Sequence, residues 1–308
     1  MKTLTTRPMT KSALAVARQA MAVARDALPP YSAPRSRKTY TQHQLFAALA
    51  VRPFLGTDYR GMEQHRKDWS DLRRELALGD RVPDHTTLKR AADRLPKKKG
   101  ADALIAAAVR GGRRLLPAKA RAAVDSTGFD GPVVSRYDTT RGGRRVVQRR
   151  WPKLTVALDI RSHLILSARV TRGPDQDAPH LVPVVRAAVR VRRLDTVPAD
   201  AGYDSEDNHA TPRAKLKVRS TVIPLNRRGT RKHPPTKYRK QMLRRFRKRT
   251  SKGARKGRRV YGQRRQVESG FSRLKRLLRS TVRAVEWMSQ KKELMLRVIV
   301  YNLMLLAA

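Results

Sequence analysis

The order of the apolar runs after Leu115 constrains the fold of this chain more than any other sequence feature. Two of these runs end at a carboxylate, the first at Asp125 and a later one at Asp200. Between them lie two stretches that alternate apolar and polar residues, which is typical of half-buried strands, and the short connection Ser162-His163 predicts that they pair as an antiparallel hairpin. The expected elements are strands at 121–124, 154–160, 164–170, 194–199 and 221–225, a helix at 181–191, and a helical C-terminus.

This order of strands and helices resembles that of a ribonuclease H-like α/β domain. The resemblance implies a mixed five-stranded sheet flanked by helices, in which the first and fourth strands are parallel neighbours. Adjacent strands lie about 4.8 Å apart, and ligands of open α/β sheets bind at the carboxyl ends of the strands. Asp125 and Asp200 are therefore expected to lie side by side, where they can share a metal ion.

The charge of the chain predicts a polyanionic partner. Its 308 residues include 71 lysines and arginines against 24 acidic residues, a formal net charge of +47. A compact fold with this charge repels itself and favours a nucleic acid partner, DNA or RNA. The cations are spread along the chain, which disfavours a membrane surface. Aromatic residues make up only 5% of the chain, so single-strand binding by base stacking is not favoured.

The residue types that are absent or scattered exclude several kinds of site. The chain has no cysteine, which excludes disulfides, thiolate zinc sites and a cysteine nucleophile. Its seven histidines include no pair at ligand-like spacing, so a histidine-based metal site is not expected. The apolar segment 294–308 contains Arg297 and is too short to span a bilayer, which indicates a buried helix.

The first hundred residues are expected to be helical. Thr41 can cap one helix, residues 62–78 suit another, and Pro83-Asp84-His85 precedes a helix that begins at Thr86. Residues 1–100 are therefore predicted to form a small helical region that binds DNA ends or dimerises, or alternatively a helical cap on the remainder. The second domain is expected at residues 115–308.

A helix-like stretch at residues 261–275 concentrates the chemistry. Tyr261, Arg264, Glu268 and Lys275 are spaced 3, 4 and 7 residues apart, which places them on one face of a helix. Cations suit a phosphate backbone, and a single carboxylate among them suits a metal ion. The apolar stripe on which this helix would pack consists of Val267, Phe271, Leu274 and Leu278.

These motifs together resemble those of DDE transposases of bacterial and archaeal insertion sequences. The signature Y-x2-R-x3-E-x6-K of one large group matches Tyr261, Arg264, Glu268 and Lys275. The other matches are the second-aspartate motif D-x-G-[FY] at Asp200, Gly202 and Tyr203, the first-aspartate motif at Asp125-Ser126-Thr127, and an N-terminal motif at residues 83–88. The resemblance covers the chain from about residue 40 to its C-terminus.

The resemblance implies an active site and a reaction. Asp125, Asp200 and Glu268 would be the catalytic carboxylates and would hold two Mg²⁺ ions, with Mn²⁺ as a substitute. The enzyme would cleave DNA at the ends of an insertion sequence and join the freed 3′-OH to target DNA. Arg264 and Lys275 would bind end phosphates, and Tyr261 would stack or hydrogen-bond near the cleaved strand.

The implied partner is double-stranded DNA, both as terminal inverted repeats and as target, and a second copy of the chain is expected on that DNA. The resemblance also implies a place in the cytoplasm of a prokaryote, associated with the nucleoid, and no membrane contact. Two alternatives remain, a catalytically inactive DNA-binding protein derived from a transposase and a basic RNA-binding protein.

Several neighbouring residues compete for these roles or for a simpler explanation. Asp159 lies in the expected hairpin and could point at the site. Asp204, Glu206 and Asp207 follow Asp200 closely, but loop surface is the expected place for them. Residues 226–260 show no apolar periodicity and are expected to be a solvated basic loop in the unbound protein, or an arm that becomes ordered on DNA.

Overall fold

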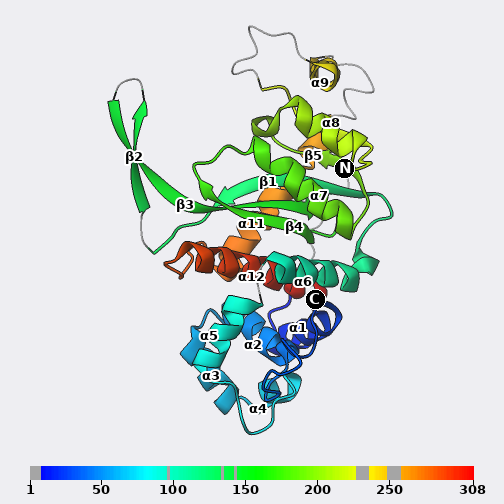
Figure 1. The fold of residues 1–308 in the computed structure, drawn as a ribbon. Helices are drawn as coiled ribbons and strands as arrows, with labels where there is room; N and C mark the ends of the chain where they lie inside the picture. Colours follow the sequence, from blue (N-terminus) through cyan, green and yellow to red (C-terminus); the bar gives the residue numbers. More distant parts are fainter. Residues whose placement is uncertain (1–7, 96–97, 133–134, 142–143, 227–235, 248–257) are drawn as a thin grey trace. The chain divides into compact units, whose positions relative to one another are not determined.

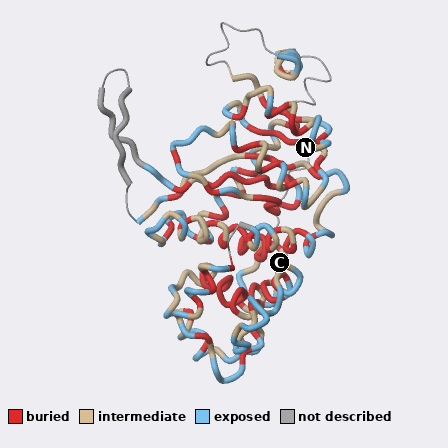
Figure 2. The backbone as a smooth tube through the Cα atoms, viewed as in Figure 1, coloured by how far each residue is buried: buried red, intermediate tan, exposed pale blue. Residues whose placement is uncertain are grey.

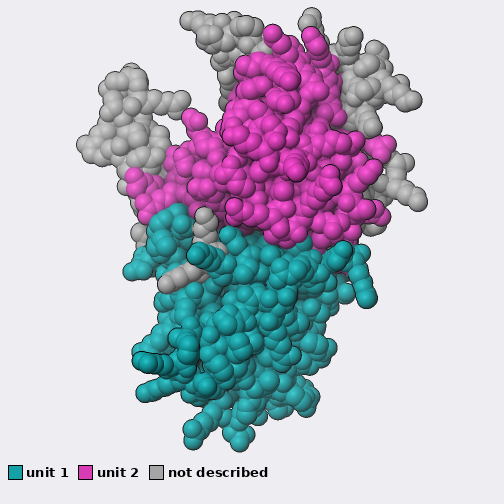
Figure 3. All heavy atoms as spheres, turned by 45° about the vertical axis from the view of Figure 1, so that its right-hand side comes forward, with its two compact units in different colours: residues 1–114, 273–308 teal, residues 115–272 magenta. Residues whose placement is uncertain are grey.

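A computed structural model describes residues 8–95, 98–132, 135–141, 144–226, 236–247 and 258–308. The chain divides into two compact units, which Figure 3 shows in different colours. Unit 1 combines Met1–Arg114 with Arg273–Ala308, and unit 2 is Leu115–Ser272.

Unit 1 is helical, as the sequence predicts, and its helices begin at capping residues. The predicted cap at Thr41 is a full capping box with Gln44, whose side chain accepts from the Thr41 backbone N–H. The predicted helix at Thr86 begins one residue earlier, because Asp84 is the cap and accepts from the backbone N–H of Thr87. The helices of this unit are α1 (Ala13–Ala27), α2 (Gln42–Leu55), α3 (Tyr59–Asp68), α4 (Ser70–Glu75), α5 (His85–Arg94), α6 (Lys98–Gly111) and α12 (Trp287–Leu306), with a 3₁₀ turn at Arg113–Leu115.

The C-terminal helix α12 is part of the core of unit 1. It contacts α6, α2 and α1, and every residue from Leu296 to Leu305 is buried. The prediction of a buried C-terminal helix is therefore confirmed. No helix among the described residues is both long and apolar enough to cross a membrane.

This packing differs from the predicted division of the chain. The sequence suggested one domain from residue 115 to 308, whereas residues 273–308 form a compact unit with the N-terminal helices. The physical reason is the apolar surface of α12, which is covered by helices from the start of the chain. The roles predicted for the two halves are a separate matter and stay predictions.

Unit 2 contains the mixed sheet that the sequence predicts. Its five central strands run in the order β4-β3-β1-β5-β6, and β2 extends the sheet beyond them by pairing with the first half of the long β3. The β3–β4 hairpin is antiparallel and β1 is parallel to β5, both as expected. Figures 1 and 2 show this sheet and the buried backbone at its centre. The strands are β1 (Ala120–Gly128), β2 (Ser135–Arg141), β3 (Arg144–Asp159), β4 (Ile165–Gly173), β5 (Leu194–Pro198) and β6 (Ser220–Val222).

Strand β2 and the first half of β3 were not predicted. The segment Arg144–Arg150 carries four arginines and shows no alternation of apolar and polar residues. Its strand conformation comes from the antiparallel ladder between β2 and β3, which a pattern of apolar residues does not reveal.

The helices of unit 2 are placed by buried apolar faces. The predicted helix α7 (Leu181–Val191) packs on β3 and β4 through Leu181, Val184, Val185 and Ala188. The others are α8 (Glu206–Ala214), α9 (Lys237–Arg247) and the first part of α11 (Arg265–Leu278), whose last residues belong to unit 1, with 3₁₀ turns at Ala178–His180 and Ala201–Tyr203. Helix α9 corrects part of the prediction that residues 226–260 form a solvated loop, while 227–235 and 248–257 lie outside the described residues.

Candidate active site

The two predicted aspartates follow residues that touch across adjacent parallel strands. Val124 at β1 and Ala199 after β5 form a parallel bridge, and Asp125 and Asp200 come directly after them. The structure therefore brings the two carboxylates to the same edge of the sheet, as the sequence suggested. One detail differs, because β1 does not end at Asp125 but continues to Gly128 through its pairing with β3.

A chain of hydroxyl groups joins the two aspartate motifs. The Ser126 hydroxyl lies 2.6 Å from the Tyr203 hydroxyl and 2.8 Å from the Thr155 hydroxyl. Tyr203 is buried, and burial raises the pKa of its hydroxyl, which keeps it a neutral donor. Sequence reasoning placed Ser126 and Tyr203 in motifs but missed this link, which fixes the loop after Asp200 against the strand of Asp125.

Arg264 connects the first aspartate to the glutamate. One of its guanidinium nitrogens, Nη1, lies 2.8 Å from Glu268 Oε1 and 3.4 Å from Asp125 Oδ2. Tyr261 donates its hydroxyl to Asp200 Oδ1 at 3.1 Å. The segment of the signature motif thus contacts both aspartate loops, and Glu268, with a side chain 49% exposed, remains open to solvent.

The expected single helix over residues 261–275 is interrupted. Helix α11 begins at Arg265, and the preceding residues form a tighter turn in which the N–H of Arg264 bonds to the carbonyl of Tyr261. Residues 258–262 are helical and residues 263–264 form the turn, yet Arg264 still pairs with Glu268 four residues later, and Tyr261 reaches Asp200. Lys275 lies on α11 two turns after Glu268 and is half-buried.

The electrostatics of the site show an excess of negative charge. Burial, together with the charges of Asp200 and Glu268, raises the pKa of Asp125 to about 6, although the Ser126 N–H and Arg264 favour its ionised form. Arg264 pairs with two of these three carboxylates, Asp125 and Glu268, in a chain that elsewhere has a large excess of cations. A carboxylate with its pKa raised by like charges is stabilised in its ionised form by an added cation.

The donor set fits a hard cation. Within the residues that the structure describes, no three histidine, cysteine, aspartate or glutamate side chains are gathered tightly enough to hold one metal ion. The guanidinium of Arg264 instead pairs with Asp125 and Glu268. Oxygen ligands of this type are those that Mg²⁺ prefers.

Asp159, the predicted rival ligand, has a structural role. Its side chain is buried, and Oδ1 accepts from the backbone N–H groups of Arg161 and Ser162 and from the Ser162 hydroxyl. These contacts shape the connection between β3 and β4, so Asp159 is not one of the grouped carboxylates.

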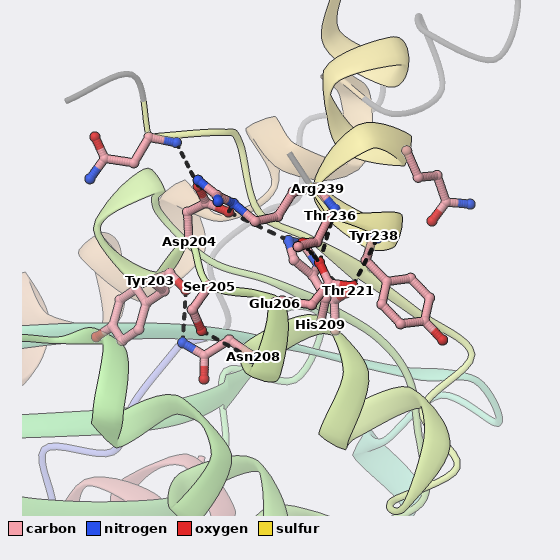
Figure 4. A network of polar contacts seen from close by, with 12 residues as sticks. Tyr203, Asp204, Ser205, Glu206, Asn208, His209, Thr221, Thr236, Tyr238 and Arg239 are labelled. Carbon is pink, nitrogen blue, oxygen red and sulfur yellow. Dashed lines mark hydrogen bonds and ion pairs between the residues drawn. The ribbon is translucent and has the colours of Figure 1, made fainter. Parts of the chain in front are cut away.

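Asp204 is also not a surface residue, contrary to expectation. Its side chain is 1% exposed and pairs with Arg239 of α9, with Nη2 2.9 Å from Oδ2. The same carboxylate accepts from the backbone N–H of Asn226 and lies 3.9 Å from His209 Nε2. Figure 4 shows how these side chains converge from α8, α9 and the loop after Asp200.

Glu206 holds the start of α9. It accepts from the Thr236 hydroxyl and from the backbone N–H groups of Tyr238 and Arg239 (Figure 4). The basic helix is therefore attached to unit 2 by two acidic residues that follow Asp200 within six positions. Asp207 is exposed and bonds to the hydroxyl of Thr211, as a surface residue of α8.

Comparison with known proteins identifies the family of the chain. No curated protein sequence matches the chain. The model of one protein family, the transposase DDE domain, matches residues 117–303, more than half of the chain and all three grouped carboxylates. The chain therefore belongs to the transposase DDE domain family.

Proposed function

We propose that this transposase cleaves DNA at the ends of an insertion sequence and joins the freed 3′-OH to target DNA by metal-dependent phosphoryl transfer. The observation that carries the proposal is the parallel bridge between Val124 and Ala199, which sets Asp125 and Asp200 beside each other. The bridge of Arg264 to Asp125 and Glu268 adds the third carboxylate.

In this proposal Asp125, Asp200 and Glu268 hold two Mg²⁺ ions, or Mn²⁺ in their place. Such ions activate water and stabilise the leaving oxygen of a phosphodiester. The chain supplies the ligands and their placement: the Ser126–Tyr203 link fixes the two aspartate loops, and the Tyr261 hydroxyl orients Asp200. Burial and the charge of Asp200 raise the pKa of Tyr261, so its hydroxyl keeps the proton that it donates.

Arg264 would change partners during the reaction. With the carboxylates neutralised by metal, its guanidinium is free to bind a phosphate of the DNA end, where bidentate contacts are favourable. Lys275 on α11 would bind a second phosphate. Residues 1–100 would bind the terminal inverted repeats, with two copies of the chain on one DNA pair, and the basic segment 226–260 would contact the backbone.

The test is a joining assay with the purified full chain. Labelled duplexes carrying the ends of an element are incubated with an unlabelled target plasmid and Mg²⁺, and the expected product is the labelled 3′ end joined covalently to the plasmid. EDTA should abolish the product. Binding of the duplex without cleavage under any divalent cation would indicate an inactive DNA-binding protein, and preference for RNA over the duplex would overturn the proposal.

A further inference from the structure

A basic site lies entirely within unit 1. A cavity of about 420 Å³, open to solvent on one side, is lined by the loop before α2, the start of α2 and the side of α5. Three arginines line it, Arg37 from the loop and Arg90 and Arg94 from α5, and none of its described lining residues is acidic. The remaining lining is rich in hydroxyl groups, including those of Tyr31, Tyr40 and Thr87.

The loop is held in place at both of its ends. Gln42 donates its side-chain amide to the Pro29 carbonyl at 2.9 Å and its backbone N–H to the Pro30 carbonyl at 2.7 Å. The ring of His43 lies 2.8 Å from the Leu28 carbonyl. The middle of the loop is closed by Ser36, whose hydroxyl bonds to the Ala33 carbonyl. The cavity is therefore bounded by fixed backbone.

The two arginines of α5 point away from the core. They are four residues apart, so they lie on one face of the helix, while Leu88, Ala91 and Ala92 bury the other face. A ligand above that face meets two guanidinium groups from the helix and a third from the loop.

The charge of this cavity is not neutralised by the protein. Among the described residues no hydrogen bond or ion pair involves the side chain of Arg37, Arg90 or Arg94. The two carboxylates of the α5 region are engaged elsewhere: Asp84 caps the helix, and Asp93 pairs with Lys89 and Lys292. Residues 27–57 contain no acidic residue at all.

We propose that this cavity binds one phosphate of a DNA backbone together with its neighbouring sugars. Three guanidinium groups and several hydroxyl donors around one space match the oxygens of a phosphodiester. The volume is in the range of ligand sites and exceeds what a bare ion requires. The ligand being DNA rests on the proposed function and on the net charge of +47.

The test compares two double variants with equal charge change. The first is Arg90→Gln with Arg94→Gln, and the second is Arg25→Gln with Arg60→Gln, which are exposed arginines of unit 1 outside the cavity. Binding of a generic 30-base-pair duplex is measured against NaCl concentration in EDTA. For the cavity variant, the slope of log K against log[NaCl] should become less negative by about 0.9, the value for one phosphate. The control variant should keep the wild-type slope.

Three further measurements keep the outcomes separate. Melting temperatures check that both double variants fold, and Arg37→Gln repeats the test from the loop if the helix variant is unfolded. Titration with inorganic phosphate or a nucleoside monophosphate, followed by melting temperature, tests for a free anion. Stabilisation of the wild type but not of the cavity variant, with equal DNA slopes, would assign the site to a free phosphate and overturn the DNA assignment.

Failure of this inference is distinguishable from failure of the proposed function, because the binding assay contains no divalent cation and needs no catalysis. Equal slopes for the two double variants overturn the cavity site alone. Absence of any duplex binding by the wild-type chain overturns the proposed function as well.

Discussion

Asp200 and Asp204 are four residues apart, yet they lie in opposite surroundings. Asp204 is enclosed, and its charge is balanced by Arg239 and by backbone donors. Asp200 is exposed and accepts from Tyr261, near Asp125 and Glu268, which share the guanidinium of Arg264. The balanced cluster, Asp204 with Arg239, attaches helix α9. The unbalanced cluster, Asp125, Asp200 and Glu268 around Arg264, keeps a net negative charge that a cation can neutralise. Charge balance, and not proximity to a motif, separates the acid of the structural ion pair from the proposed metal ligand.

The largest expected effect tests the unbalanced cluster. Asp125→Asn, Asp200→Asn and Glu268→Gln each remove one charge at constant size, and we expect each to lower Mg²⁺-dependent nicking of end DNA by about 10³-fold or more. Duplex binding should be kept or slightly tightened. Asp207→Asn is the matched control and should nick like the wild type. Nicking by Glu268→Gln at the control rate would remove Glu268 from the site.

The balanced cluster should respond in stability instead. Asp204→Asn leaves Arg239 largely buried without a counter-charge, and removal of one partner of such a pair costs about 3 kcal/mol of unfolding free energy. Urea unfolding monitored by circular dichroism measures it. Asp207→Asn again serves as control, and Asp200→Asn should change stability little. If Asp204→Asn unfolds at the wild-type urea midpoint, the contrast between the two aspartates is lost.

The pH dependence of stability sharpens the same contrast. The pKa of Asp125 is about 6 in the folded chain and about 3.9 in an unfolded one. The folded state therefore holds an extra proton between these values, and in EDTA its unfolding free energy should fall by about 3 kcal/mol as the pH rises from about 4 through 6.

The Asp125→Asn variant should lack this fall, so the difference between the two unfolding curves isolates the group. Added Mg²⁺ should stabilise the wild type more at pH 8 than at pH 5, because only the ionised carboxylate binds it. Parallel curves for variant and wild type in EDTA would mean that Asp125 is not strained by its neighbours.

The smallest effect concerns the link between the two aspartate motifs. Ser126→Ala leaves the buried Tyr203 hydroxyl without this partner and should cost about 1 kcal/mol. Ser126→Thr retains the hydroxyl and is the control. Nicking should decrease only several-fold, since the carboxylates themselves remain. A loss as large as that of Asp125→Asn would show that the hydroxyl takes part in the chemistry.

Local patterns predicted the parts of the site that local chemistry determines. An apolar run that ends at Asp125 or Asp200 is visible in the sequence, as is the four-residue spacing of Arg264 and Glu268, and the structure groups these side chains. Their catalytic role stays a prediction, since geometry shows only that they meet.

Long-range partners explain what the sequence did not reveal. The partner of Asp204 is 35 residues away, and strand β2 is defined by its ladder with β3. Asp159 looked like a possible ligand because the sequence does not show that its carboxylate accepts from Ser162. That bond depends on the conformation of the β3–β4 connection, which apolar spacing does not predict. The cavity beside α5 likewise depends on a loop without periodicity, which is fixed by side-chain bonds to backbone carbonyls.

The discontinuity of unit 1 has a consequence for how the protein is made. Helix α12 contributes the last residues of the chain to a core that also needs α1, α2 and α6. During synthesis the N-terminal helices leave the ribosome long before their partner, and unit 2, whose residues are contiguous, can fold in the interval. We therefore expect the N-terminal helices of a nascent chain to remain sensitive to protease until α12 has left the ribosome.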